Sequence, residues 1–129
     1  MSIQFRDDDL DRAAPFGVLC GEDLVVRRQG PSWARLGVTL VGRPLLEVLE
    51  VVRPLGVSTI EQIRSHRDSM LLMRLLPEGP RLRFQAVDVA DPAGVLLIGN
   101  PIVSSSQELD RLGLSAADFS PVDQTPDLL

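Results

Sequence analysis

The sequence contains no lysine and no tyrosine, and it has one cysteine, one histidine and one tryptophan. A single thiol, Cys20, excludes an internal disulfide and a multi-thiolate metal site, and its apolar surroundings favour a buried position. The 13 basic residues are all arginines and are scattered along the chain. With so few aromatics, they provide no basic, base-stacking face, so we expect no nucleic-acid partner.

Long apolar runs are also missing. A bilayer-spanning helix needs about 20 apolar residues, and no run here approaches that length, so we expect no membrane partner. Met1–Leu10 contains Arg6 and three aspartates and has no apolar core of a signal peptide, which predicts a cytoplasmic location. The 129 residues, 44% hydrophobic and 24% charged, indicate one globular domain.

Turn and periodicity signals divide the chain into two strands, several short helices and three further strands. A short acidic helix over 7–14 precedes them. Two capping boxes, Ser58–Glu61 and Ser105–Glu108, support helices in the second half. The predicted strands are Phe16–Cys20, Leu24–Gln29, Met70–Leu76, Arg81–Val89 and one from Val95 to Ile98; the predicted helices are 33–40, Leu45–Val52, Thr59–His66 and Gln107–Leu112.

This order predicts an α+β fold. Strands joined by tight turns must be antiparallel, and helices gathered mid-chain must cover one face of the sheet. It is the order of a PAS-like fold: a five-stranded antiparallel sheet with short helices on one face, here with an N-terminal helical cap. We expect a cap over 1–14, a PAS-like domain over 15–119 and a linker over 120–129 that leads to a signalling helix.

Several segments also follow one another at a spacing typical of a known family. They are Pro15–Val18, Glu22–Val26, Arg53-Pro54, Thr59–His66, Leu82–Gln85, Leu96–Pro101, Arg111–Phe119 and Asp123–Leu128. The most specific is Arg111–Phe119, with the sequence RLGLSAADF. Together they resemble the PAS-like domain associated with H-NOX gas sensors in soluble guanylate cyclases and bacterial sensor histidine kinases. The sequence departs from that family where Phe84 replaces a usual glycine and Pro126 an arginine.

The resemblance implies a non-catalytic dimerisation and signal-relay domain in nitric-oxide or oxygen signalling. Its implied partners are a second copy or a paralogue, an H-NOX sensor domain, and a coiled coil with an output domain. In such proteins haem belongs to the separate H-NOX domain, so the resemblance implies no cofactor here. The parent protein would be a histidine kinase or a nucleotide cyclase.

The residues offer little for chemistry of their own. Ser104–Ser106 lacks a nucleophile-elbow frame, and the aspartates from Asp7 to Asp11 lack the glycine and glutamate positions of a calcium loop. We therefore predict no catalytic residue and no metal site. The alternative is a PAS sensor that binds haem or another small molecule, with His66 as the axial candidate; a residue at a helix end is the simpler interpretation of His66.

The third predicted strand suggests where a partner binds. Period-two alternation places Leu71, Met73 and Leu75 on one face, and the opposite face is also apolar apart from Arg74. A free sheet face is normally more polar, so this second face needs a cover. The N-terminal segment or a second subunit could provide it, and a purely intramolecular lid stays open as an alternative. The predicted dimer interface is Ile3, Phe5, Leu10, Met70, Leu72, Arg74 and Leu76.

Overall fold

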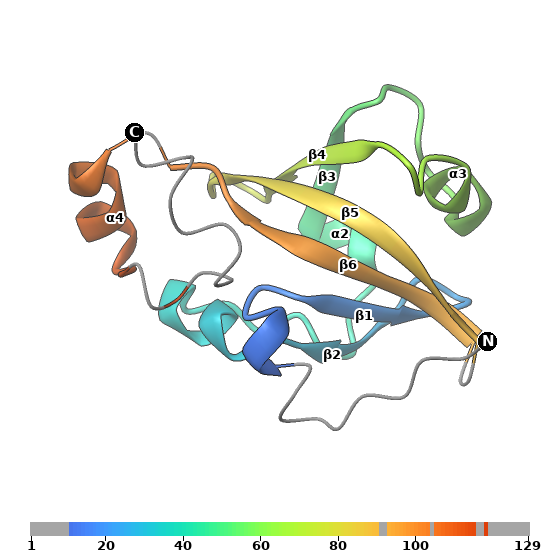
Figure 1. Ribbon diagram of the computed structural model, residues 1–129, viewed down its shortest axis with the longest axis horizontal. Helices are drawn as coiled ribbons and strands as arrows, with labels where there is room; N and C mark the ends of the chain where they lie inside the picture. The colour runs from blue at the N-terminus through green and yellow to red at the C-terminus, as the bar shows by residue number, and fades with distance from the viewer. Residues whose placement is uncertain (1–10, 91–92, 104, 116–117, 119–129) are drawn as a thin grey trace.

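The strands form an open antiparallel sheet with the order β2-β1-β6-β5-β4-β3, in which β6 pairs with β1 from the other end of the chain (Figure 1). The computed structural model describes residues 11–90, 93–103, 105–115 and 118. The strands are β1 (Val18–Gly21), β2 (Val26–Gln29), β3 (Leu49–Arg53), β4 (Met70–Leu75), β5 (Arg81–Ala90) and β6 (Ala93–Pro101). The helices are η1 (Pro31–Leu36, a 3-10 helix), α2 (Leu45–Val48), α3 (Ile60–Ser65) and α4 (Ser106–Leu112). The predicted α+β class is confirmed, but the sheet formed by the described residues has six strands and not five.

The additional strand comes from the segment predicted as one helix over Leu45–Val52. The helix ends after a single turn at Val48, and the chain continues as β3, which pairs with β4. Val51 and Val52 are β-branched and fit a pleated strand better than a helix. Pairing also satisfies backbone groups along the edge of β4.

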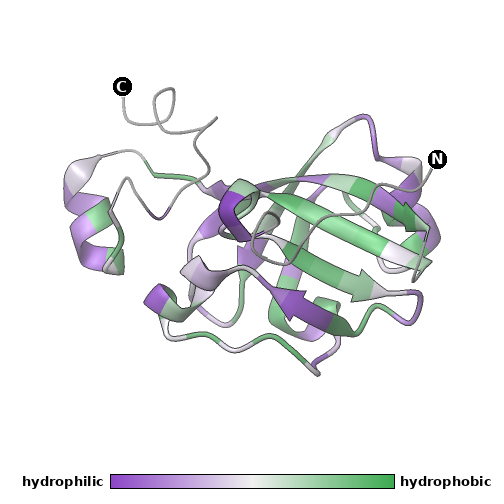
Figure 2. Cartoon of the chain, turned by 60° about the horizontal axis from the view of Figure 1, so that its bottom comes forward, coloured by the Kyte–Doolittle hydropathy of each residue, from purple (hydrophilic) through white to green (hydrophobic). Residues whose placement is uncertain are grey.

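The long β5–β6 hairpin forms the middle of the sheet. Phe84 on β5 lies opposite Gly99 on β6. A Cβ atom at Gly99 would lie 1.8 Å from the backbone oxygen of Arg83, so no larger residue fits there without moving a strand. At this cross-strand pair, the large ring of Phe84 therefore lies opposite a residue that has no side chain, Gly99. Hydrophobic residues concentrate on the strands of the sheet (Figure 2).

The core lies between one face of the sheet and the segment that connects β2 to β4. Leu71, Met73 and Leu75 of β4 point into it, which confirms the predicted alternation. Trp33 of η1 is fully buried, contacts the ring of Phe16 edge-on, and donates an indole hydrogen bond of 3.0 Å to the Phe16 carbonyl. The helical segments and the inner sheet face contribute to a single buried cluster.

Two helices begin at side-chain caps. Thr59 and Gln62 form the capping box of α3, so the box predicted at Ser58 and Glu61 is wrong by one residue. For α4, the Ser105 hydroxyl accepts a 3.2 Å hydrogen bond from the Glu108 amide, and Gly113 ends the helix in the left-handed conformation.

Residues 11–13 are helical and belong to the expected N-terminal cap. Ile3, Phe5 and Leu10 lie outside the described residues, as does the expected linker over 120–129. In the part of the chain that the structure describes, no helix combines the length and apolar character needed to cross a bilayer.

Candidate interaction surface and C-terminal contact

The sheet face turned away from the core, here called the outer face, divides into two zones. Opposite residues on antiparallel strands share a face, so strand register defines the rows. The rows nearest the β4–β5 turn form the arginine zone: Glu50, Arg74, Arg81, Arg53, Leu72, Arg83 and the buried Asn100. The rows further from that turn hold Met70, Gln85, Ile98, Val87, Leu96 and Leu19, which form the apolar zone, and they end at Arg28 on β2.

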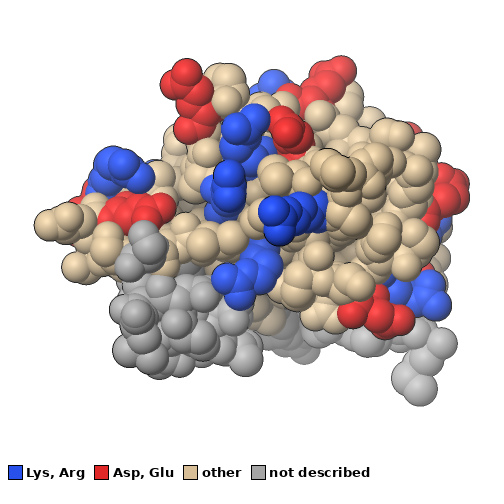
Figure 3. Space-filling view, turned by 90° about the horizontal axis from the view of Figure 1, so that it is seen from above, with Lys and Arg blue, Asp and Glu red and all other residues tan. Residues whose placement is uncertain are grey.

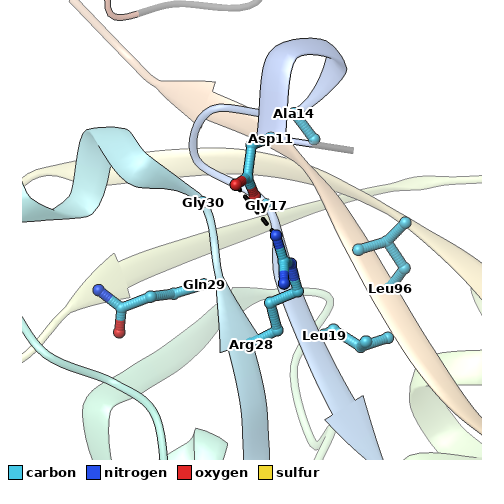
Figure 4. A pocket seen from close by; sticks show the side chains of 8 residues that line it. All are labelled: Asp11, Ala14, Gly17, Leu19, Arg28, Gln29, Gly30 and Leu96. Carbon is cyan, nitrogen blue, oxygen red and sulfur yellow. Dashed lines mark hydrogen bonds and ion pairs between the residues drawn. The ribbon is translucent and has the colours of Figure 1, made fainter. Parts of the chain in front are cut away.

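The apolar zone is covered at one end and open at the other. At the β1 end, Leu96 is 5% exposed and Leu19 is half-buried. There Asp11 of the helical residues 11–13 accepts a 3.0 Å hydrogen bond from Arg28 of β2 (Figure 4). At the β4 end, Met70 is 51% exposed. The N-terminal helical residues therefore lie at the β1–β2 end of the outer face.

The pocket beneath these helical residues is small. Its lining includes Ala14, Gly17, Leu19 and Leu96 (Figure 4). It has a cavity volume of about 10 Å³, which is the space of roughly one water molecule. It cannot hold haem or another cofactor.

The arginine zone concentrates positive charge on a chain of net charge −5. Arg53, Arg81 and Arg83 are exposed, whereas Arg74 is partly buried. Arg74 donates a 3.0 Å hydrogen bond to Glu50, and its buried Nε finds no partner among the described residues. Figure 3 shows basic side chains gathered in the middle of one face, with most acidic side chains toward its margins.

The C-terminal part of the described chain is fixed to η1, in an arrangement that we call the Asp118 contact. The Ser32 hydroxyl donates a 2.7 Å hydrogen bond to the Asp118 backbone oxygen. The Asp118 carboxylate accepts hydrogen bonds from the Ser115 amide at 2.8 Å and from Arg35 Nε at 3.3 Å. Asp118 is buried. Ser32 and Arg35 are both more than 80 positions away from Asp118 in the sequence, so the contact joins distant parts of the chain.

A second charged group fixes α3 to the end of the sheet. Arg64 hydrogen-bonds both carboxylate oxygens of Glu22, in the β1–β2 turn, and Asp88 of β5 at 2.8 Å. The hydrogen bond from Arg64 lowers the pKa of Glu22 below its usual value, and the same bond raises the pKa of Arg64. His66 follows as the C-cap residue of α3, where its backbone amide donates to Ile63.

Cys20 is buried on the inner face of β1. Burial raises the pKa of its thiol to about 12, and the Asp23 carboxylate adds to the effect. The thiol is therefore protonated at neutral pH and unsuited to nucleophilic or metal-binding chemistry. Across residues 11–90, 93–103, 105–115 and 118, no three histidine, cysteine, aspartate or glutamate side chains are placed to hold a metal ion.

The structure brings together part of the predicted interface. Met70, Leu72 and Arg74 share the outer face, and Leu76 follows the last residue of β4 in a half-buried position. Neither the Asp118 contact nor the arginine zone was predicted from the sequence. A local signal existed for the Asp118 contact: Ser115 and Asp118 have the spacing of a capping box.

No protein-family model and no curated protein matches the chain.

Proposed function

We propose that this chain is a non-catalytic, PAS-like dimerisation and signal-relay domain of a cytoplasmic gas-sensing protein. Domains of this class join a nitric-oxide or oxygen sensor of the H-NOX type to a coiled coil and an output histidine kinase or guanylate cyclase. The partner in the dimer is a second copy or a paralogue. The half-open apolar zone of the outer sheet face carries the proposal.

Strand order supports the PAS-like part of the proposal. Without the edge strand β3, the sheet has five strands, and the helices η1, α2 and α3 lie between the second and the third of them. The helical segment covers the inner face, which leaves the outer face to a partner. This is the layout that the family resemblance implies.

The apolar zone supports dimerisation through that face. Its β1 end lies under the chain's own N-terminal helical residues, whereas Met70 at the β4 end is half exposed next to Gln85 and Ile98. A large apolar side chain in a sheet row is stabilised when a second surface removes it from water. A stable dimer would bury about 1,600 Å² in total.

The Asp118 contact supports the relay part. It lies at the end of the RLGLSAADF segment, and it fixes this segment to η1, beside the fully buried Trp33. A rearrangement of the helical layer would thus be transmitted to the chain that follows Asp118. A change in the packing of the core would then affect both the chain that follows Asp118 and the outer sheet face.

Sedimentation velocity of the full chain at micromolar concentration tests the dimer. We expect the wild type to sediment as a dimer and Met70→Asp as a monomer, because a buried carboxylate at the interface is strongly unfavourable. Leu55→Asp is the matched control, since Leu55 is 88% exposed and lies outside the sheet. Circular dichroism verifies that both variants are folded. A monomeric wild type, or equal dissociation of both variants, would contradict the proposal.

A further inference from the structure

We infer that Met70 is a reversible oxidation site through which peroxide controls the proposed dimer. The inference rests on the proposed function, because it assigns a regulation to the same apolar zone. Its starting point is the exposure of the sulfur-bearing side chains in the described part of the chain. Met70 is 51% exposed, whereas Cys20 and Met73 are 1% and 0% exposed. An oxidant in solution therefore reaches Met70 before the other two.

Strand alternation produces the contrast between the two methionines of β4. Met70 and Met73 are three residues apart, so they lie on opposite faces of the sheet. Met73 belongs to the buried cluster of the inner face, and Met70 lies at the uncovered β4 end of the apolar zone. Because the two thioethers share one short strand, Met73 serves as an internal reference for the reactivity of Met70.

Hydrogen peroxide is the class of oxidant that reacts directly with a thioether. The sulfur lone pair attacks one peroxide oxygen and forms the S–O bond of methionine sulfoxide, while the O–O bond breaks and the second oxygen leaves as water. Sulfur gives up two electrons, and peroxide takes them up. Methionine sulfoxide reductases reverse the change with two thiols, which become a disulfide while the sulfoxide oxygen leaves as water.

The neighbours of Met70 determine how the sulfoxide affects the interface. Gln85 on β5 lies directly opposite Met70 and is exposed, and Ile98 of β6 continues the same row. The sulfoxide oxygen is a polar acceptor, and the side-chain amide of Gln85 is a donor at cross-strand distance. On a free face, water and Gln85 satisfy this oxygen. Against the apolar zone of a second subunit the water is lost, so oxidation favours separate subunits.

Dimerisation and oxidation of Met70 therefore oppose each other. The dimer covers the thioether and slows its reaction, whereas the sulfoxide places a polar group in an otherwise apolar contact. Met70 should consequently react more slowly as the protein concentration is raised and the dimer fills. Met73 is buried by its own subunit, so its rate should not depend on protein concentration.

Peroxide treatment of the full chain, followed by peptide mass spectrometry, tests the site. Trypsin cleaves after Arg67 and Arg74, so one peptide contains both methionines, and its fragment ions identify each sulfoxide separately. We expect Met70 to be oxidised about tenfold or more faster than Met73, since Met73 reacts only when β4 opens locally. Equal rates for the two methionines, or a rate for Met70 that is independent of protein concentration while a dimer forms, would overturn the inference.

Sedimentation velocity tests the effect on the dimer. We expect peroxide to raise the dimer dissociation constant of the wild type by about tenfold or more, and a methionine sulfoxide reductase with dithiothreitol to restore it. Met70→Leu is the matched control, because leucine keeps the site apolar and has no sulfur to oxidise, so peroxide should leave its dimer unchanged. Circular dichroism verifies that the oxidised chain is folded.

The outcomes separate this inference from the dimer itself. A wild type that is monomeric before peroxide is added contradicts the proposed function. A dimer that survives complete oxidation of Met70, or that weakens equally in the wild type and in Met70→Leu, contradicts the oxidation switch and leaves the dimer standing.

Discussion

Replacing Asp118 with alanine tests the contact that fixes the C-terminal segment to η1. The substitution removes the carboxylate that accepts hydrogen bonds from the Ser115 amide at 2.8 Å and from Arg35 Nε at 3.3 Å. It leaves the hydrogen bond from Ser32, because that bond ends on the Asp118 backbone. The variant therefore isolates the contribution of one side chain to the contact.

The expected cost follows from the burial of each partner. Asp118 is 9% exposed, and a hydrogen bond from a backbone amide to a charged, buried acceptor contributes about 1.5–3 kcal/mol. The Arg35 side chain is 63% exposed, so the ion pair adds under about 1 kcal/mol. We expect Asp118→Ala to lower the free energy of unfolding by about 2 kcal/mol. For a chain of this size that corresponds to a decrease of roughly 8 °C in Tm.

Urea unfolding at a fixed protein concentration measures this difference, since association would make stability depend on concentration. Asp118→Asn keeps an oxygen acceptor for the Ser115 amide and should cost less than about 1 kcal/mol. Arg35→Met should cost no more than that, for the reason given above. A loss below about 0.5 kcal/mol in Asp118→Ala, or an equal loss in Arg35→Met, would refute the reasoning.

Two predictions concern titration. The raised pKa of Cys20 means that the contribution of this thiol to stability is complete below about pH 9 and is lost as pH rises toward 12; the loss amounts to at most about 4 kcal/mol. Urea unfolding across this range should show the decrease in the wild type and a smaller one in Cys20→Ala, and parallel curves would contradict it. The lowered pKa of Glu22 means that its pairing with Arg64 stabilises the fold above the ordinary carboxyl pKa, and that this stabilisation is lost as pH falls through the lowered value. A carboxyl-carbon NMR titration should show the midpoint of Glu22 rising in Arg64→Met but not in the control Arg67→Met, and an unchanged midpoint would disprove the pairing.

Much of the fold could be predicted because its signals are local. Alternation along β4, the turn between β4 and β5, and the Ser105 and Gly113 caps of α4 depend on residues close together in the chain. The helix prediction over Leu45–Val52 failed because its apolar residues suit either period. Pairing with β4, more than 20 residues away, decides in favour of a strand after Val48. The α3 cap was misplaced because Ser58 and Thr59 both match the box pattern.

The sites depend on pairings that no local pattern encodes. The arginine zone exists because strand register places Arg74 opposite Arg81 and Arg53 in the same row as Arg83. In the sequence these residues are separated, and only Arg81 and Arg83 are near neighbours. The Asp118 contact needs Ser32 from the other end of the chain. The residues on the outward-facing side of β4 could be predicted, because period-two alternation along a single strand is enough to assign them.

The position of Trp33 gives the protein a built-in optical probe. It is the single tryptophan of the chain, it is fully buried, and it follows directly after Ser32, which holds the Asp118 backbone. Its emission is therefore sensitive to any loosening of the C-terminal segment that lets water reach the indole ring. Movement at the exit of the domain can thus be followed in solution by intrinsic fluorescence, without attaching a dye.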